Sequence, residues 1–371
     1  MAEMASSRTI LISAGGTGGH MSPAAALAGD LRARSFQVQL ATDTRGLSYS
    51  GDFGDEKLHV LKAGYLGAGV TGKIKGALKL AAGYFQARKL IKCIKPEVVV
   101  GFGGYPSLPA VLAAQHIGIP TIIHEQNAIL GRANAFLAPK ASRIATSLTS
   151  TAGLDEADAV SAVVTGNPVR ADIAKMYTQP YPELRHDGTL HLFVIGGSLG
   201  ASVFSDVVPA ALSALDTAYK NRLYVVQQAR EEDIARTRHA YEEAGIAAET
   251  QPYFDDVAPR LTACHLVIAR AGASTVAEIV TTGRPAIFVP YPYHADQQQK
   301  INADTVADAG GAWVMTQAGF TADVLSSRIE TFLQNPQTLF HAAEKARSCA
   351  RPDAARRLGN LVVALAAGWE G

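Results

Sequence analysis

Short apolar segments alternate with helical patterns along most of the chain. In the first half, segments rich in β-branched and apolar residues predict strands at Thr9–Ser13, Phe36–Ala41, Val98–Gly101, Thr121–His124, Arg143–Ala145 and Ala162–Thr165. Apolar positions at helical spacing predict helices near 22–34, 73–94 and 107–117, between several of these strands. Strands that alternate with helices in this way are typical of βαβ units, which build parallel sheets.

The second half repeats the scheme. We predict strands at Leu190–Ile195, Leu223–Gln227, Leu266–Ala269 and Ala286–Val289, with helices at 201–216, 231–244, 274–282 and 295–309. Beyond Thr321 the pattern turns helical, in three segments that end near Ala367. The expected fold class is therefore α/β, with two Rossmann-like, doubly wound parallel-sheet domains.

A Gly-Asn-Pro cluster at 166–168 interrupts both periodicities and marks the expected domain boundary. Residues 1–168 would form an N-terminal domain and residues 169–371 a C-terminal domain with additional helices at its end. The 371 residues suit two domains of roughly 170 residues each.

Composition and charge exclude several classes of protein. With 48% hydrophobic and 18% charged residues, the chain is globular, and no apolar run is long enough to span a bilayer. Three dispersed cysteines argue against a disulfide framework or a zinc site. A net charge of +1 argues against nucleic acid as a partner. Residues 57–96, however, contain nine basic residues and no acidic one, which favours contact with an anionic surface: Lys57, Lys62, Lys73, Lys75, Lys79, Arg88, Lys89, Lys92 and Lys95.

The sharpest motif is Gly15-Gly16-Thr17-Gly18-Gly19-His20, between the first strand and a helix. Consecutive glycines let backbone N–H groups approach a ligand, and a helix N-terminus favours an anion, so phosphate is the expected guest. The motif lacks the Gly-Lys-Ser/Thr of a Walker loop, and Met21 replaces the third glycine of a dinucleotide fingerprint. Asp43, after the second strand, keeps a ribose-binding interpretation open, and a tight structural turn is the simpler alternative.

Two further glycine-rich loops follow predicted strands, at 101–107 and 196–201. Three such loops at strand ends suggest that both domains handle phosphates, with Ser198 as an added hydroxyl donor. At the domain junction, Arg170 could reach a diphosphate, although an interdomain ion pair is the alternative.

Polar residues also follow other strands. The run His124-Glu125-Gln126-Asn127 makes Glu125 and Asn127 candidate site residues, with a local hydrogen-bond network as the alternative. The segment 270–278 places small residues at a helix start and Glu278 four residues after Ser274, where a carboxylate can accept ribose hydroxyls or simply complement the helix dipole. The segment 294–302 is rich in amides, which suit sugar hydroxyls.

Taken together and in order, these motifs resemble those of the MurG family of bacterial peptidoglycan glycosyltransferases, over nearly the whole chain. The resemblance implies a GT-B fold, with two domains facing across a cleft and the last helix packing back on the first domain. It implies transfer of N-acetylglucosamine from UDP-N-acetylglucosamine to undecaprenyl-diphosphate-MurNAc-pentapeptide (lipid I). The product, lipid II, would form with inversion on the cytoplasmic side of the bacterial plasma membrane.

By motif position, the resemblance also implies the donor-site residues. Glu278 would hold the ribose, Gln298 the sugar hydroxyls, and Phe254 would lie beside the uracil. The complete donor set is Thr17, Gly18, Gly19, Asn127, Arg170, Ser198, Phe254, Ala273, Ser274, Thr275, Val276, Ala277, Glu278 and Gln298. Leu199 and Phe254 depart from the residues common in the family, which puts their contacts with the donor in doubt.

The expected reaction is a single displacement, with His20 as the candidate general base and Glu125 as the alternative. No D-x-D triplet or zinc-type cluster is present, so we expect no metal or other cofactor. Three rival functions remain on sequence grounds: a UDP-N-acetylglucosamine 2-epimerase, a non-catalytic sugar-nucleotide binder and a dinucleotide-dependent oxidoreductase. The sequence leaves protein partners unknown.

Overall fold

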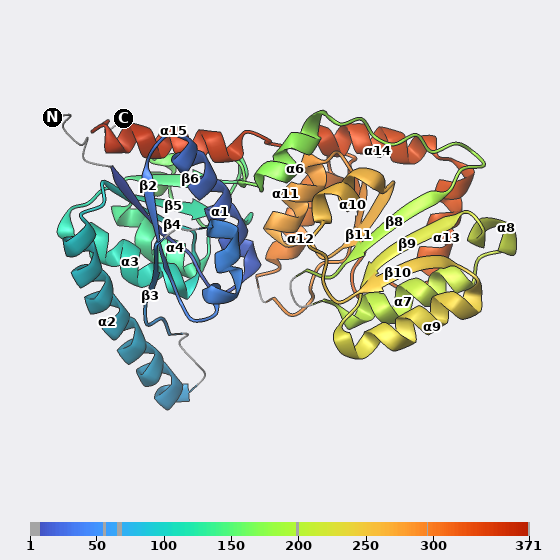
Figure 1. The fold of residues 1–371 in the computed structure, drawn as a ribbon, viewed down its shortest axis with the longest axis horizontal. Coiled ribbons are helices and arrows are strands. Elements are labelled where there is room, and N and C mark those ends of the chain that lie inside the picture. Colours follow the sequence, from blue (N-terminus) through green and yellow to red (C-terminus); the bar gives the residue numbers. More distant parts are fainter. Residues whose placement is uncertain (1–7, 55–56, 65–68, 198–199, 295, 370–371) are drawn as a thin grey trace. The chain divides into compact units, whose positions relative to one another are not determined.

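The computed structural model describes residues 8–54, 57–64, 69–197, 200–294 and 296–369. The described residues fall into two compact units, one within 1–171 together with 353–371 and the other within 172–352 (Figure 1). The change of unit at 171/172 lies close to the boundary expected at 168/169. The C-terminal residues from Asp353 onward, however, belong to the first unit and not to the second.

The first unit is built on a seven-stranded sheet with the order β3-β2-β1-β4-β5-β6-β7, in which every pairing is parallel. Its strands are β1 Thr9–Ser13, β2 Gln37–Thr42, β3 Lys57–Val60, β4 Val98–Gly101, β5 Thr121–Glu125, β6 Arg143–Thr146 and β7 Ala162–Val164. Its helices are α1 Gly18–Ala33, α2 Gly69–Ile94, α3 Gly104–Ile117, α4 Arg132–Leu137, α5 Glu156–Val160 and α15 Ala354–Ala366, with 3₁₀ turns η1 Gly46–Phe53 and η2 Ala138–Lys140.

Alternate residues of β1 enter cores on opposite faces of this sheet. Ile10 and Ile12 pack with α1 and α15, whereas Leu11 packs with α2 and α3 (Figure 1). Because both faces are covered, the strands are continuous apolar runs with no polar face, as the sequence showed. The C-terminal helix α15 thus completes the core of the first unit.

The second unit has a six-stranded parallel sheet with the order β10-β9-β8-β11-β12-β13. Its strands are β8 Leu190–Ile195, β9 Leu223–Gln228, β10 Ala247–Gln251, β11 Leu266–Ala269, β12 Ala286–Phe288 and β13 Ala312–Val314. Its helices are α7 Ser202–Ser213, α8 Thr217–Lys220, α9 Ile234–Ala244, α10 Val257–Ala263, α11 Ala273–Thr281, α12 Gln298–Ala307, α13 Ala322–Gln334 and α14 Gln337–Ser348. Helix α6 Ala171–Lys175 and the turn η3 Met176–Thr178 precede the sheet, and η4 Glu231–Asp233 leads into α9.

Every predicted strand is present, and the α/β class with two doubly wound parallel sheets is confirmed. The sequence analysis missed β3, β10 and β13, all of which lie at sheet edges. Edge strands are covered on fewer sides, and these three are partly exposed, so their apolar signal is weak. Helices α1 and α3 also begin earlier than predicted, within their glycine loops.

The strand orders place the glycine-rich loops at topological switch points. In the first unit β1 lies between β2 and β4, and in the second β8 lies between β9 and β11. The loops after β1, β4, β8 and β11 therefore leave the carboxyl edge where the winding direction reverses, which is the usual ligand position in such sheets. No helix in the described ranges combines the length and hydropathy needed to cross a bilayer.

Candidate functional site

The loop after β1 is held by a buried carboxylate. Oδ1 of Asp43 accepts hydrogen bonds from the backbone N–H groups of Gly16 and Gly46, both at 3.0 Å. Its Oδ2 pairs with Nε of Arg45 at 2.9 Å. Asp43 is thus engaged in shaping the glycine loop, which removes the main support for a ribose-binding role of this residue.

The glycine loops after β1 and β4 lie directly against each other. A Cβ added at Gly15 would come within 2.7 Å of Cβ of Pro106, so only glycine permits this approach. Gly103 and Gly104 have φ angles of +80° and +70°, which L side chains rarely adopt. A Cβ on Gly104 would lie 3.3 Å from Nε2 of His20, so these glycines keep that edge of the imidazole open.

His20 lies in the first turn of α1 and is half-buried. Its Nδ1 is 3.2 Å from Oε1 of Gln126, at the end of β5. The preceding residues Thr17 and Gly19 are exposed, and Thr17 is the extended N-cap without a side-chain capping bond. The structure therefore brings the first and fifth strand ends of this unit together around His20.

The other candidate base, Glu125, is enclosed by donors. Its side chain is 2% exposed. Oε1 accepts from the backbone N–H and the side-chain amide of Asn127, at 3.0 and 3.2 Å. Oε2 accepts from the Gly131 N–H at 2.9 Å and from Nδ2 of Asn134 at 2.8 Å. Four hydrogen bonds make this carboxylate an organiser of the loop after β5, as in the network alternative.

His124 lies beneath these residues and is completely buried. Burial and, to a smaller extent, nearby His20 lower its pKa to about 4, partly offset by a bond to the Gly166 backbone. It is therefore neutral at physiological pH. In the same unit, Arg170 follows the buried Val169 and is itself half-buried.

In the second unit, the loop after β8 is bent by glycines. A Cβ on Gly196 would lie 2.4 Å from the backbone nitrogen of Ala201, whereas Gly197, with a φ of +83°, has open space at that position. Gln228, at the end of β9, accepts from the Gly196 N–H at 3.0 Å and donates to the Pro252 carbonyl at 3.1 Å. Ser198 and Leu199 lie outside the described residues.

Helix α11 starts directly after the β11 loop, with Gly272 as an N-cap that carries no side chain. The peptide at Ala271 is held from both sides by α12: its N–H donates to Oε1 of Gln299 at 3.3 Å and its carbonyl accepts from Nδ2 of Asn302 at 3.3 Å. In this first part of α11 every candidate except the buried Val276 is half-buried: Ala273, Ser274, Thr275, Ala277 and Glu278. The helix thus presents small residues and one carboxylate at the sheet's carboxyl edge.

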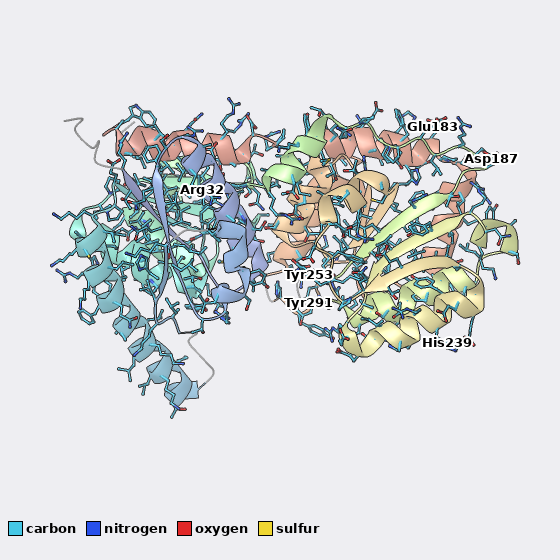
Figure 2. The ribbon with its side chains drawn as sticks, in the orientation of Figure 1. Arg32, Glu183, Asp187, His239, Tyr253 and Tyr291 are labelled. Atoms are coloured by element: carbon cyan, nitrogen blue, oxygen red, sulfur yellow. The ribbon has the colours of Figure 1, made fainter. Side chains whose placement is uncertain are left out.

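The start of α12 is tied to the same place. Gln299 Oε1 also accepts from the Tyr291 N–H at 2.9 Å, which links the loop after β12 to the loop after β11. Nε2 of Gln298 lies 3.0 Å from Nδ1 of His294. The rings of Tyr291 and His294 pack edge to face, and Figure 2 labels Tyr291 among the side chains of this region. The start of α12 is therefore held next to the loop that leads into α11, and the Gln298 side chain is held by His294.

Phe254 is buried in the second unit. Its side chain is 4% exposed and packs against Phe193, with ring centroids 5.7 Å apart. The guanidinium of Arg260 lies 4.3 Å over the same ring. The phenyl ring thus packs into the core of the second unit, whereas neighbouring Tyr253 is exposed (Figure 2).

Sequence reasoning missed Asn134, Gln228, Gln299 and Asn302 as organisers of these loops, whereas Gln126 lies in the run for which a hydrogen-bond network was the alternative. Gln228 carries a recognisable signal, because it is an amide at the carboxyl end of an apolar strand. Among the residues that the structure describes, no group of three or more His, Cys, Asp or Glu is arranged to hold a metal ion.

Comparison with known proteins identifies similarity over both units. Residues 10–146 match the glycosyltransferase family 28 N-terminal domain, and residues 191–358 match the glycosyltransferase family 28 C-terminal domain. The UDP-N-acetylglucosamine--N-acetylmuramyl-(pentapeptide) pyrophosphoryl-undecaprenol N-acetylglucosamine transferase of Rhodospirillum centenum is 46% identical, covering 96% of this chain and 94% of its own.

Solved structures agree with this similarity. MurG of Acinetobacter baumannii aligns with a TM-score of 0.77 at 31% identity, covering 96% of this chain and 99% of that chain. A putative UDP-N-acetylglucosamine 2-epimerase of Listeria monocytogenes aligns with a TM-score of 0.70 at 13% identity, over 97% of this chain and 96% of that one. The second likeness shows a shared fold alone.

Proposed function

Since this chain belongs to glycosyltransferase family 28, we propose that it transfers N-acetylglucosamine from UDP-N-acetylglucosamine to undecaprenyl-diphosphate-MurNAc-pentapeptide, which converts lipid I to lipid II. The observation that carries this proposal is the 46% identity to a transferase named for that reaction, over nearly the full length of both chains. The epimerase alternative rests on fold likeness at 13% identity and is not favoured. The enzyme is a hexosyltransferase of peptidoglycan precursor synthesis.

The second unit is proposed to bind the donor. Small residues from Ala273 to Ala277 leave the α11 N-terminus open to the diphosphate, and Gly196 and Gly197 offer backbone N–H groups at the neighbouring strand end. Glu278 would accept the ribose hydroxyls. The amide of Gln298, which can both donate and accept, would bind the sugar hydroxyls. Phe254 would support this pocket from within the core.

His20 is proposed as the general base of a single displacement. The attacking acceptor hydroxyl gives its proton to the imidazole while its oxygen forms a bond to the anomeric carbon. The bond from that carbon to the diphosphate oxygen breaks, and UDP leaves with the electron pair. Glu125 is better suited to positioning, because its two oxygens already accept four hydrogen bonds. Asn127, held by Glu125, and the loop of Thr17, Gly18 and Gly19 would line the site on this unit.

The charge that develops on UDP is proposed to be stabilised by backbone groups and one guanidinium, without a metal. The α11 N-terminus and the loop after β8 supply oriented dipoles, Arg170 supplies a planar cation, and Ser198 would add a hydroxyl. Chelators should therefore leave turnover unchanged.

Helix α2 is proposed to hold the enzyme on the cytoplasmic face of the membrane. Ile74, Leu78 and Phe85 share one face of the helix and are 55%, 66% and 65% exposed. The opposite face, at Gly76, Gly83 and Ala87, is buried. Exposed lysines flank the apolar face, an arrangement that suits an anionic bilayer surface: Lys73, Lys75, Lys79, Lys89 and Lys92.

The proposed reaction is tested with labelled UDP-N-acetylglucosamine, with and without a lipid I analogue. Labelled disaccharide-lipid should form only when the acceptor is present, and at the same rate in EDTA. Epimer formation without acceptor, or binding without turnover, would reject the transfer reaction. Loss of activity in EDTA would reject only the metal-free site.

Membrane attachment is tested by sedimentation with vesicles that contain anionic lipid. A Lys73→Glu, Lys75→Glu, Lys79→Glu variant should bind roughly a hundredfold less tightly, since each basic residue near the surface contributes about 1 kcal/mol. The control carries an equal charge change on exposed residues of the second unit: Lys175→Glu, Arg238→Glu and Lys345→Glu. Equal vesicle binding by the two variants would contradict the role of α2.

A further inference from the structure

A continuous line of hydrogen bonds runs through the first unit from the backbone of Gly166 to His20. The Gly166 carbonyl lies 3.0 Å from Nε2 of His124. Nδ1 of His124 lies 3.0 Å from Nε2 of Gln126. Oε1 of Gln126 lies 3.2 Å from Nδ1 of His20. Neither the glycine-loop chemistry nor the donor site uses His124, Gln126 or the Gly166 carbonyl.

The orientation of the Gln126 amide follows from its surroundings. Its nitrogen lies 3.1 Å from the carbonyl oxygen of Phe102 and 3.2 Å from that of His124. Carbonyl oxygens only accept hydrogen bonds, so the NH₂ group must face them. The amide oxygen must then face His20.

The tautomer of His124 is determined in the same way. The Gly166 carbonyl can only accept, so Nε2 of His124 carries a proton and donates it. Complete burial lowers the pKa of His124 to about 4, so the ring is neutral and its Nδ1 has a lone pair. The Gln126 NH₂ group thus has three acceptors around its two protons, the carbonyls of Phe102 and His124 and this lone pair, which reinforces the orientation of the amide.

We propose that Gly166, His124 and Gln126 form a relay that holds neutral His20 in the tautomer with its proton on Nδ1, so that Nε2 is the proton acceptor of the reaction. The amide oxygen of Gln126 can only accept, and His20 Nδ1 must therefore donate to it. Gln126 and His124 are positioning residues, since they act through His20. The role of Nε2 rests on the proposed transfer reaction, whereas the tautomer does not.

The surroundings of Nε2 agree with this assignment. Gly104 has no Cβ to fill the space 3.3 Å from Nε2, and Gly103 has none to fill the space 3.6 Å from Cε1. The ring edge that carries the lone pair is thus the edge that the two positive-φ glycines leave open.

A neutral partner at Nδ1 has a chemical consequence. A carboxylate in this position would stabilise the imidazolium, the form that cannot accept the proton of the acceptor hydroxyl. An amide oxygen orients the ring without that charge. The relay therefore defines the tautomer of the base without placing a charge beside it.

The tautomer is measured directly by ¹⁵N NMR of histidine-labelled full-length protein, with the His20→Gln variant to assign the His20 signals. At pH 8 the Nδ1 signal of His20 should have the shift and the proton coupling of a protonated nitrogen, and Nε2 those of a bare one. A predominant Nε2–H tautomer, or an even mixture, would overturn the proposal whether or not the protein proves to be a transferase.

Variants of Gln126 test the consequence for activity. Gln126→Leu should show mixed His20 tautomers and a kcat at least roughly tenfold lower, with the KM for UDP-N-acetylglucosamine unchanged. Gln126→Glu should move the acid limb of the kcat/KM profile up by about one pH unit. Gln115→Leu is the matched control, because Gln115 also donates to a backbone carbonyl of this unit but does not contact His20.

The outcomes are separable. Unchanged His20 signals in Gln126→Leu would refute the relay. An unshifted pH profile in Gln126→Glu, with UDP binding intact, would also count against it. If Gln126→Leu does not fold, the spectrum of the wild-type protein decides alone. A correct tautomer in a protein without transfer activity would refute the proposed function and leave the relay standing.

Discussion

The two units share one architecture but equip it with different chemistry. Each has a glycine-rich loop after a central strand at the point where the winding reverses. Around the loops of the first unit lie titratable side chains, His20, His124 and Glu125, each held by hydrogen bonds. In the second unit the loops are held by the neutral amides of Gln228, Gln299 and Asn302.

This difference separates proton transfer from ligand binding. A base needs a defined protonation state, which requires ionisable groups in controlled surroundings. Binding a diphosphate through backbone N–H groups requires only that the loops keep their shape, and amides achieve this without adding charge. The formal charge of the sequence differs in a similar way: residues 1–168 carry 16 basic and 11 acidic residues (+5), and residues 169–371 carry 18 basic and 22 acidic residues (−4).

The largest expected effect comes from removing the base of the first unit. His20→Ala should lower kcat by about 10²- to 10⁴-fold and leave UDP binding unchanged, because His20 is not among the proposed donor contacts. The measurements are steady-state kinetics and calorimetric titration with UDP. His59→Ala, in the same unit and bonded to Gln39, is the control and should keep normal kcat. A near-normal kcat in His20→Ala would contradict the assignment of proton transfer to the first unit.

Acid should destabilise both units through buried neutral histidines. Burial lowers the pKa of His124 in the first unit to about 4, and burial together with His191 lowers that of His265 in the second unit to about 4. The unfolded chain takes up these protons near pH 6.5, so stability is complete above that pH and falls as the pH drops toward 4. For wholly buried His124 the loss is about 3 kcal/mol.

The two tryptophans allow the loss of stability in acid to be measured in each unit separately. Trp313 lies in β13 of the second unit, and Trp369 follows α15 in the first. Trp313→Phe leaves Trp369 to report on the first unit, and Trp369→Phe leaves Trp313 to report on the second. In urea unfolding of both variants, the free energy of unfolding should be lower at pH 5.0 than at pH 7.5. Adding His265→Asn to Trp369→Phe should reduce the loss reported by Trp313. No change in that loss would assign the acid sensitivity to other groups.

The second unit is tested at its carboxylate. Glu278→Gln should weaken binding of UDP and of UDP-N-acetylglucosamine by about 10- to 100-fold, since a hydrogen bond to a charged group contributes about 1.5–3 kcal/mol. At saturating donor, kcat should change little, in contrast to His20→Ala. The control is Glu344→Gln, at an exposed position of α14. Equal affinity of Glu278→Gln and wild-type protein would remove Glu278 from the donor site.

The smallest effect concerns the glycines beside the base. Gly104→Ala places a methyl group 3.3 Å from Nε2 of His20 and should lower kcat by roughly tenfold. Because of its positive φ, the substitution should also lower the free energy of unfolding by about 1–2 kcal/mol. The control is Gly118→Ala, at the other end of α3, where φ is +83° and an added Cβ meets open space. It should lower stability by the same amount and leave kcat unchanged. Thermal unfolding and kcat are compared for the two. Similar kcat values would show that access to Nε2 is not limiting.

Local patterns in the sequence were sufficient for the central strands, the glycine turns and the α/β class. A strand buried on both faces must be apolar throughout, as in Val98–Gly101, and a chain that turns sharply into a helix needs glycine, as at Gly103. These requirements act within a few residues, so the sequence expresses them directly. The motifs that carry the family resemblance are also short, so they and their order are visible in the sequence.

Tertiary packing alone decided the edge strands and the roles of several polar residues. Strand β10 is defined by its pairing with β9, and its own pattern is too weak to predict it. Glu125 reads as a free carboxylate until Gly131 and Asn134 are seen to enclose it. The packing of the Phe254 ring against Phe193 and Arg260 is likewise absent from the local sequence pattern. Hydrogen bonds and burial depend on neighbours that are distant in sequence, and only the folded chain brings those neighbours together.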